Sequence, residues 1–92
     1  MKVNFYATYR PIVGGKTVEF DLDQDITLRL LVQAIITRFP PMQREMLDDH
    51  GNLYSHVHIF VNGRDSALMA EKLDTVLQVD DIVNIFPPVG GG

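Results

Sequence analysis

The residues most able to take part in chemistry stand at the end of the chain, in Pro87-Pro88-Val89-Gly90-Gly91-Gly92. The two prolines fix φ and lack backbone donors, so we expect the chain to leave its last strand as an extended arm. The three glycines then present bare backbone and the α-carboxylate of Gly92. This combination suits insertion of a carboxyl terminus into a channel too narrow for side chains. We therefore predict that the tail is the functional site, with a frayed terminus as the alternative.

The composition predicts one small folded domain. The chain has 92 residues, 46% of them hydrophobic, which is enough for a single core. It contains no cysteine, so disulfides, thiolate metal sites and iron–sulfur clusters are excluded. The net charge is −4 and the eight basic residues are scattered, so we expect no nucleic-acid partner. No segment resembles a membrane span or a signal peptide, and we expect a cytoplasmic protein with no membrane partner.

The first part of the chain is predicted to form a β-hairpin followed by a helix. Apolar and polar residues alternate over 3–9 and again over 18–22, with a turn at Gly14-Gly15. Thr27 has the side chain of a helix N-cap, and Pro40-Pro41 should end the helix. Between them the apolar residues recur at helical spacing, at Leu28, Leu31, Val32, Ile35, Ile36 and Phe39.

The second part is predicted to add two strands. A helical turn over 42–47 and a polar loop over 48–52 precede a strand over 57–61, which ends at the turn signal Asn62-Gly63. A final strand follows over 82–86. One amphipathic helix must then cover one face of the sheet, with the first and last strands parallel at its centre.

That arrangement predicts the fold class α+β, and within it a β-grasp: a mixed sheet with one main helix packed across it. It divides the chain into a β-grasp domain, residues 1–86, and a flexible C-terminal arm, residues 87–92. Because β-grasp domains include modifiers, ferredoxins and RNA-binding modules, the fold alone does not give the function. The absence of cysteine argues against a ferredoxin, and the acidic charge argues against RNA binding.

The alternation of the strands predicts a second functional surface. The sheet face opposite the helix should collect aromatic and aliphatic side chains, namely Tyr6, His58, Phe60, Ile82 and Phe86. A solvent-facing sheet is normally polar, so we expect these residues to dock a partner. The alternatives are that a loop covers part of this face, or that the register of one strand differs from the one assumed. We find no set of residues with the spacing of a catalytic or metal site, and we expect neither catalytic nor metal-binding residues.

Taken together, a predicted β-grasp and the ending Ile85-Phe86-Pro87-Pro88-Val89-Gly90-Gly91-Gly92 resemble the ThiS/MoaD family of ubiquitin-like sulfur carriers. The likeness covers essentially the whole chain. In the sequence of its tail, the chain is closest to the small subunit of molybdopterin synthase, although that subunit usually has Ala or Ser where this chain has Gly90. The segment 42–56 and the Gly14-Gly15-Lys16 turn are similar to the carrier that supplies sulfur for cysteine synthesis.

The resemblance implies that an E1-like adenylating enzyme uses ATP to activate Gly92, and that a persulfide sulfur donor then displaces AMP to leave a thiocarboxylate. Activation must come first, because a carboxylate is a poor electrophile until its oxygen becomes a leaving group. The chain would be a cosubstrate and not an enzyme, with no bound cofactor, and its partner would consume the ATP. Gly91 would let the arm approach phosphate and partner backbone closely.

Several functions stay open under this resemblance. The sequence of the tail favours a role in molybdopterin biosynthesis, in which the partner would be a sulfur-accepting enzyme such as a molybdopterin synthase large subunit. One alternative is delivery of sulfur for cysteine synthesis, thiamine synthesis or tRNA thiolation. Another is a ubiquitin-like modifier joined to protein lysines through Gly92. A plain interaction module with an incidental tail is a third class. One added C-terminal residue should abolish carrier or modifier activity and spare an interaction module.

Overall fold

The structure is a computed structural model that describes residues 1–23 and 25–88, and the predicted tail residues Val89, Gly90, Gly91 and Gly92 lie outside this range. The described chain forms one mixed sheet with the strand order β2-β1-β5-β3-β4. The strands are β1 (Lys2–Phe5), β2 (Thr17–Glu19), β3 (His58–Val61), β4 (Arg64–Asp65) and β5 (Ile82–Phe86).

The centre of the sheet confirms the predicted pairing of the first and last strands. β1 runs parallel to β5, whereas β1–β2, β3–β5 and β3–β4 are antiparallel. In the parallel pair Val3 lies opposite Val83 and Phe5 opposite Ile85. All four side chains are fully buried, so this register places one apolar row against the helix layer.

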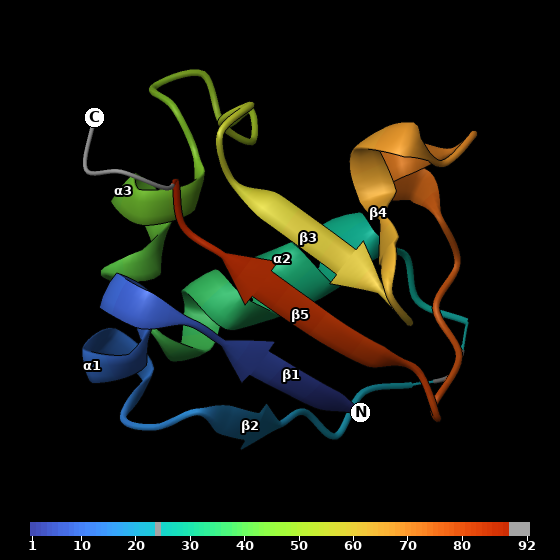
Figure 1. Ribbon diagram of the computed structural model, residues 1–92, viewed down its shortest axis with the longest axis horizontal. Helices are drawn as coiled ribbons and strands as arrows, with labels where there is room; N and C mark the ends of the chain where they lie inside the picture. The colour runs from blue at the N-terminus through green and yellow to red at the C-terminus, as the bar shows by residue number, and fades with distance from the viewer. Residues whose placement is uncertain (24, 89–92) are drawn as a thin grey trace.

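The helix α2 (Leu28–Arg38) lies across one face of the sheet and leaves the other face open (Figure 1). It begins where the sequence predicts, because the Thr27 hydroxyl accepts a hydrogen bond from the Leu30 amide at 3.2 Å. It ends at Arg38, since Pro40 and Pro41 follow and Pro cannot continue the hydrogen-bond ladder. The predicted main helix between Thr27 and Pro40-Pro41 is therefore confirmed.

The chain after β1 differs from the predicted hairpin. The first strand ends at Phe5, and a 3₁₀ turn (Ala7–Tyr9) leads into the short helix α1 (Arg10–Val13). Pro11 lies in the first turn of α1, where its missing N–H costs no hydrogen bond. Gly14 ends α1 with a φ of 81°, a left-handed conformation that glycine adopts without strain. The alternation over residues 6–9 was therefore misleading, because a helix places Tyr9 in the core as a strand would have done.

Several short segments complete the fold around the sheet. The predicted helical turn is confirmed as α3 (Met42–Met46). Asn62 and Gly63 both have positive φ, 50° and 84°, which is typical of a tight hairpin turn. That turn leads into β4, a strand of two residues that the sequence did not predict. Short 3₁₀ turns follow at Ser66–Leu68 and Lys72–Asp74.

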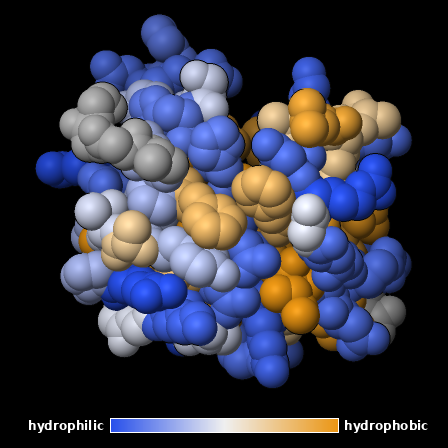
Figure 2. All heavy atoms as spheres, viewed as in Figure 1, coloured by the Kyte–Doolittle hydropathy of each residue, from blue (hydrophilic) through white to orange (hydrophobic). Residues whose placement is uncertain are grey.

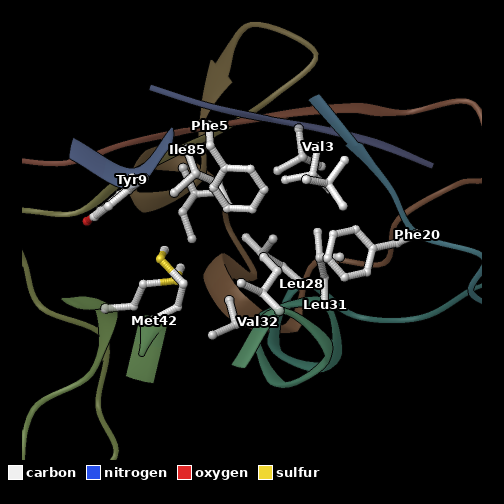
Figure 3. Close-up of a cluster of buried hydrophobic side chains, with 14 of the residues drawn as sticks. Val3, Phe5, Tyr9, Phe20, Leu28, Leu31, Val32, Met42 and Ile85 are labelled. Atoms are coloured by element: carbon white, nitrogen blue, oxygen red, sulfur yellow. The ribbon is translucent and has the colours of Figure 1, made fainter. Parts of the chain in front are cut away.

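The core fills the space between the sheet and the helices. Figure 3 shows Phe5 and Ile85 from the sheet pointing toward Leu28, Leu31 and Val32 of the α2 segment. The apolar stripe predicted for the helix is buried at four positions, and its last two members, Ile36 and Phe39, are partly buried against the core. None of the helices within the described ranges is long and apolar enough to cross a membrane.

Candidate functional site at the end of the last strand

The last strand delivers the chain to the open face of the sheet. In β5, Val83 and Ile85 are fully buried on the helix side, whereas Asn84 and Phe86 are partly exposed on the other side. Phe86 is the last residue of the strand and directly precedes the prolines. Pro87 is buried and Pro88 is exposed. The point from which the predicted arm leaves is therefore held by the sheet.

Three aromatic rings, which we call the aromatic cluster, surround this point: Tyr6, Phe60 and Phe86. The Tyr6 and Phe86 rings are stacked, with centroids 4.1 Å apart and planes at 14°. Phe60 meets Phe86 edge-to-face, with centroids 5.5 Å apart and planes at 83°. Both arrangements are favourable for aromatic pairs. Figure 2 shows apolar spheres in the middle of this face, bordered mostly by hydrophilic ones.

A chain of polar side chains fixes the neighbouring part of the same face. The Tyr6 hydroxyl donates to Asn84 Oδ1 at 3.1 Å, and Asn4 Nδ2 donates to the same oxygen at 2.9 Å. The Thr17 hydroxyl donates to Asn4 Oδ1 at 2.6 Å. Asn4 and Asn84 are direct register partners across the parallel strands. Tyr6 is thus held by its ring and by its hydroxyl, so the cluster is arranged before any partner binds.

An open groove of about 580 Å³ lies beside the cluster. Its walls come from β3, β4, β5 and the turn between β3 and β4, and it is lined by His58, Phe60, Gly63, Asp65, Asn84 and Phe86. Two aromatic rings form its apolar walls. A groove of this kind can accept an apolar side chain from a partner protein.

Four of the five residues predicted to dock a partner come together here. Tyr6, Phe60 and Phe86 form the cluster, and His58 lines the groove opposite Phe86 in register. Ile82 lies on the same face and is 45% exposed, but it is at the other end of β5. Its amide and carbonyl bond to Asn62, at 2.9 Å each. Ile82 therefore lies outside the cluster.

Arg10 belongs to this site, although the sequence did not single it out. Its Nε donates to the Phe5 carbonyl at 2.9 Å, and its guanidinium carbon lies 5.3 Å from the Tyr6 ring centroid. The helix α1, which the sequence did not predict, begins at Arg10, and the side chain lies over the Tyr6 ring.

Tyr9 is an ionisable residue of the buried core. Burial, and to a lesser extent Glu45, raises the pKa of Tyr9 to about 12. The Tyr9 hydroxyl is buried and has no hydrogen-bond partner among the described residues. Within residues 1–23 and 25–88, no three His, Asp or Glu side chains are close enough to hold a metal ion.

Comparison with known proteins agrees with this architecture. A model of the ThiS family matches residues 3–92. Small archaeal modifier protein 3 of Haloferax volcanii is 29% identical over 92 residues, which are 100% of this chain and 98% of that protein.

Solved structures give the same result. The crystal structure of SAMP1 from Haloferax volcanii is 28% identical, with a TM-score of 0.85 over 99% of this chain and 97% of that one. The putative molybdopterin converting factor subunit 1 of Pyrococcus furiosus is 29% identical, with a TM-score of 0.75 over 96% and 95%. The predicted α+β class and β-grasp fold are confirmed. The chain belongs to the ThiS family and has the ubiquitin-like β-grasp fold.

Proposed function

We propose that this protein is a sulfur carrier whose Gly92 is adenylated by an E1-like enzyme and then converted to a thiocarboxylate. The observation that carries the proposal is the ThiS-family match through residue 92, which includes the terminal glycines. The six residues 87–92, if extended, reach about 20 Å beyond Phe86. That length is enough to enter a buried active site while the folded domain stays outside.

The chemistry needs three steps. A Gly92 carboxylate oxygen attacks the α-phosphorus of ATP, and the bond to the departing pyrophosphate breaks. The terminal sulfur of a persulfide then attacks the acyl carbon, and AMP leaves. A thiol cleaves the resulting acyl disulfide, so that the thiol and the donor cysteine become a disulfide and the thiocarboxylate remains on Gly92. Every catalytic group in this scheme belongs to a partner, and the chain supplies the carboxylate and a binding surface.

The aromatic cluster and its groove are the surface that we assign to partner docking. They border the origin of the arm, so a protein that takes the arm into its active site must also cover this face. Phe60→Asp places a charge in the groove and should raise the KM for the carrier in adenylation while leaving the fold intact. Leu68→Asp is the matched control, because Leu68 is 86% exposed and does not line the groove. Equal KM values for the two variants would contradict the assignment.

For the sulfur acceptor we propose an enzyme of molybdopterin biosynthesis, such as a molybdopterin synthase large subunit. The tail sequence Phe86-Pro87-Pro88-Val89 supports this choice of acceptor, as does the similarity to a putative molybdopterin converting factor subunit. The names of the Haloferax relatives favour a second candidate, a modifier that forms an isopeptide bond between Gly92 and a lysine.

Intact-mass measurement tests the carrier function directly. Untagged protein is incubated with ATP, a persulfide donor and the E1-like enzyme of its own organism. We expect a mass change equal to one oxygen replaced by sulfur, mapped to Gly92. A chain extended by one residue after Gly92 is the control and should remain unchanged.

Two results would redirect the proposal. No mass change, with an enzyme shown to activate another carrier, would overturn the sulfur-carrier function. Lysine-linked adducts in a cell extract supplied with ATP would establish the modifier function, and their loss in the extended chain would show that Gly92 forms the bond.

A further inference from the structure

Among residues 1–23 and 25–88, Arg10 is the cationic side chain found over a ring of the aromatic cluster, that of Tyr6. Its Nε donates to the Phe5 carbonyl, and its guanidinium carbon lies over the Tyr6 ring. These contacts fix the direction of the side chain but use only one of its five N–H donors. The ion pairs among the described residues join Met1 to Glu19 and Arg29 to Asp74, and neither involves Arg10. A positioned guanidinium with donors to spare is suited to bidentate binding of a carboxylate.

The open face also has a charge polarity. Arg10 lies beside the β1 side of the cluster, whereas Asp65 lies at the groove wall formed by β4, at the other edge of the strand order. Asp65 Oδ1 accepts from the Ala67 amide at 3.0 Å, which holds that carboxylate in place. A partner with an acidic group over Arg10 is attracted, and the same group over Asp65 is repelled. Such an arrangement fixes orientation and excludes wrong partners.

The overall charge makes this position more selective. The chain carries 12 acidic and 8 basic residues, so its average field repels an acidic partner surface. Attraction at Arg10 is therefore local, and it occurs directly beside the rings that border the origin of the arm. An acidic side chain placed there would bring the neighbouring apolar surface of the partner onto the groove.

We propose that Arg10 is a specificity-determining residue, which pairs with an Asp or Glu of the adenylating enzyme while an apolar side chain of that enzyme fills the groove that Phe60 and Phe86 line. This inference rests on the proposed function, because it takes the adenylating enzyme as the partner. Under this proposal Arg10 selects the adenylating enzyme, and the tail glycines alone do not provide that selection.

Adenylation kinetics of two Arg10 variants test this inference. Arg10→Gln removes the charge and Arg10→Glu reverses it; we measure kcat and the KM for the carrier from pyrophosphate release. A charge-assisted interfacial bond predicts a KM about tenfold higher for Arg10→Gln and higher again for Arg10→Glu, with kcat unchanged. Raising the salt concentration should weaken wild-type binding more than that of Arg10→Gln.

Arg38→Gln is a closely matched control. Arg38 also lies 5.3 Å from an aromatic centroid, that of Phe20, and also donates to a backbone carbonyl, that of Glu19, at 2.7 Å. It belongs to α2, on the covered side of the sheet. The same charge change there should leave KM within twofold of wild type. Thermal unfolding of both variants shows whether their folded structures lose similar stability.

Each outcome decides the question. If the wild type is adenylated and both Arg10 variants keep its KM, the inference is wrong and the proposed function stands. A KM increase of equal size in Arg38→Gln would assign the effect to net charge and would also overturn it. An enzyme that neither binds nor adenylates the wild type would overturn the proposed function, and this inference with it.

Discussion

The stack between Tyr6 and Phe86 should couple the start of the chain to the origin of the arm, and a double-mutant cycle measures that coupling. The rings are nearly parallel at 4.1 Å, and such pairs contribute about 0.5–1.5 kcal/mol beyond their buried area. Phe86→Ala removes a half-buried ring, so it should lower the free energy of unfolding by about 2 kcal/mol, roughly half the cost for a fully buried Phe. Tyr6→Ala should cost somewhat more, because it also removes the hydrogen bond to Asn84.

The contacts that only one ring makes cancel in the cycle. The double variant should therefore be about 1 kcal/mol more stable than the sum of the single changes predicts. Urea unfolding followed by circular dichroism gives each free energy, provided that the slope m stays constant. Phe86→Ala alone should lower the Tm by about 10 °C in a domain of this size.

A second cycle serves as the control. Tyr6 and Phe60 each contact Phe86 and are not themselves an aromatic pair in the structure, so their coupling should be clearly smaller. Additivity between Tyr6 and Phe86 to within about 0.3 kcal/mol would refute the conclusion that the stack holds the end of β5, where the predicted arm begins.

Three further predictions concern the fold that supports this site. Tyr9 ionises less readily in the folded protein, because burial raises its pKa from 10.0 to about 12. The contribution of Tyr9 to the free energy of unfolding is therefore complete below about pH 10 and is lost as the pH rises toward 12. Tyr9→Phe should remove this alkaline loss, as urea unfolding at a series of pH values would show; identical pH profiles would contradict it. Leu31→Ala, at a fully buried position, should cost about 2–5 kcal/mol, whereas Leu30→Ala, 55% exposed, should cost under about 0.5 kcal/mol; equal urea midpoints would argue against the burial of Leu31. Gly63→Ala should cost about 1 kcal/mol, because φ is +84° with open space around the position, and Gly15→Ala, at a glycine without positive φ, should cost less in the same assay.

Much of the fold could be predicted from local patterns. The limits of α2 follow from Thr27 at its start and Pro40-Pro41 after its end, and its buried face follows from 3.6-residue spacing. The faces of β5 follow from a period of two. These features are encoded by residues close together in the sequence, so they can be recognised without knowing the rest of the chain. The terminal glycines and the family resemblance belong to the same group.

Strand alternation assigns Tyr6, Phe60, Ile82 and Phe86 to the open face, but no local pattern shows which of these side chains meet. Tyr6, Phe60 and Phe86 meet because β5 pairs with β1 on one side and with β3 on the other. Pairing register is set by burial of the opposite face, which places these rings together and leaves Ile82 at the far end of its strand. The strand β4 was missed for another reason, because two residues are too few to show a period.

By itself, the sequence determined the composition limits, the amphipathic helix, the alternating strands and a glycine tail that resembles the ends of sulfur carriers. Only the tertiary structure decided that the chain turns after Phe5 into α1 and places Arg10 over Tyr6. The alternation over residues 6–9 has the period of a strand, but Ala7–Tyr9 form the 3₁₀ turn that leads into α1. Packing of Tyr9 into the core through the helical path settles the choice, because burial there requires neighbours that are distant in the sequence.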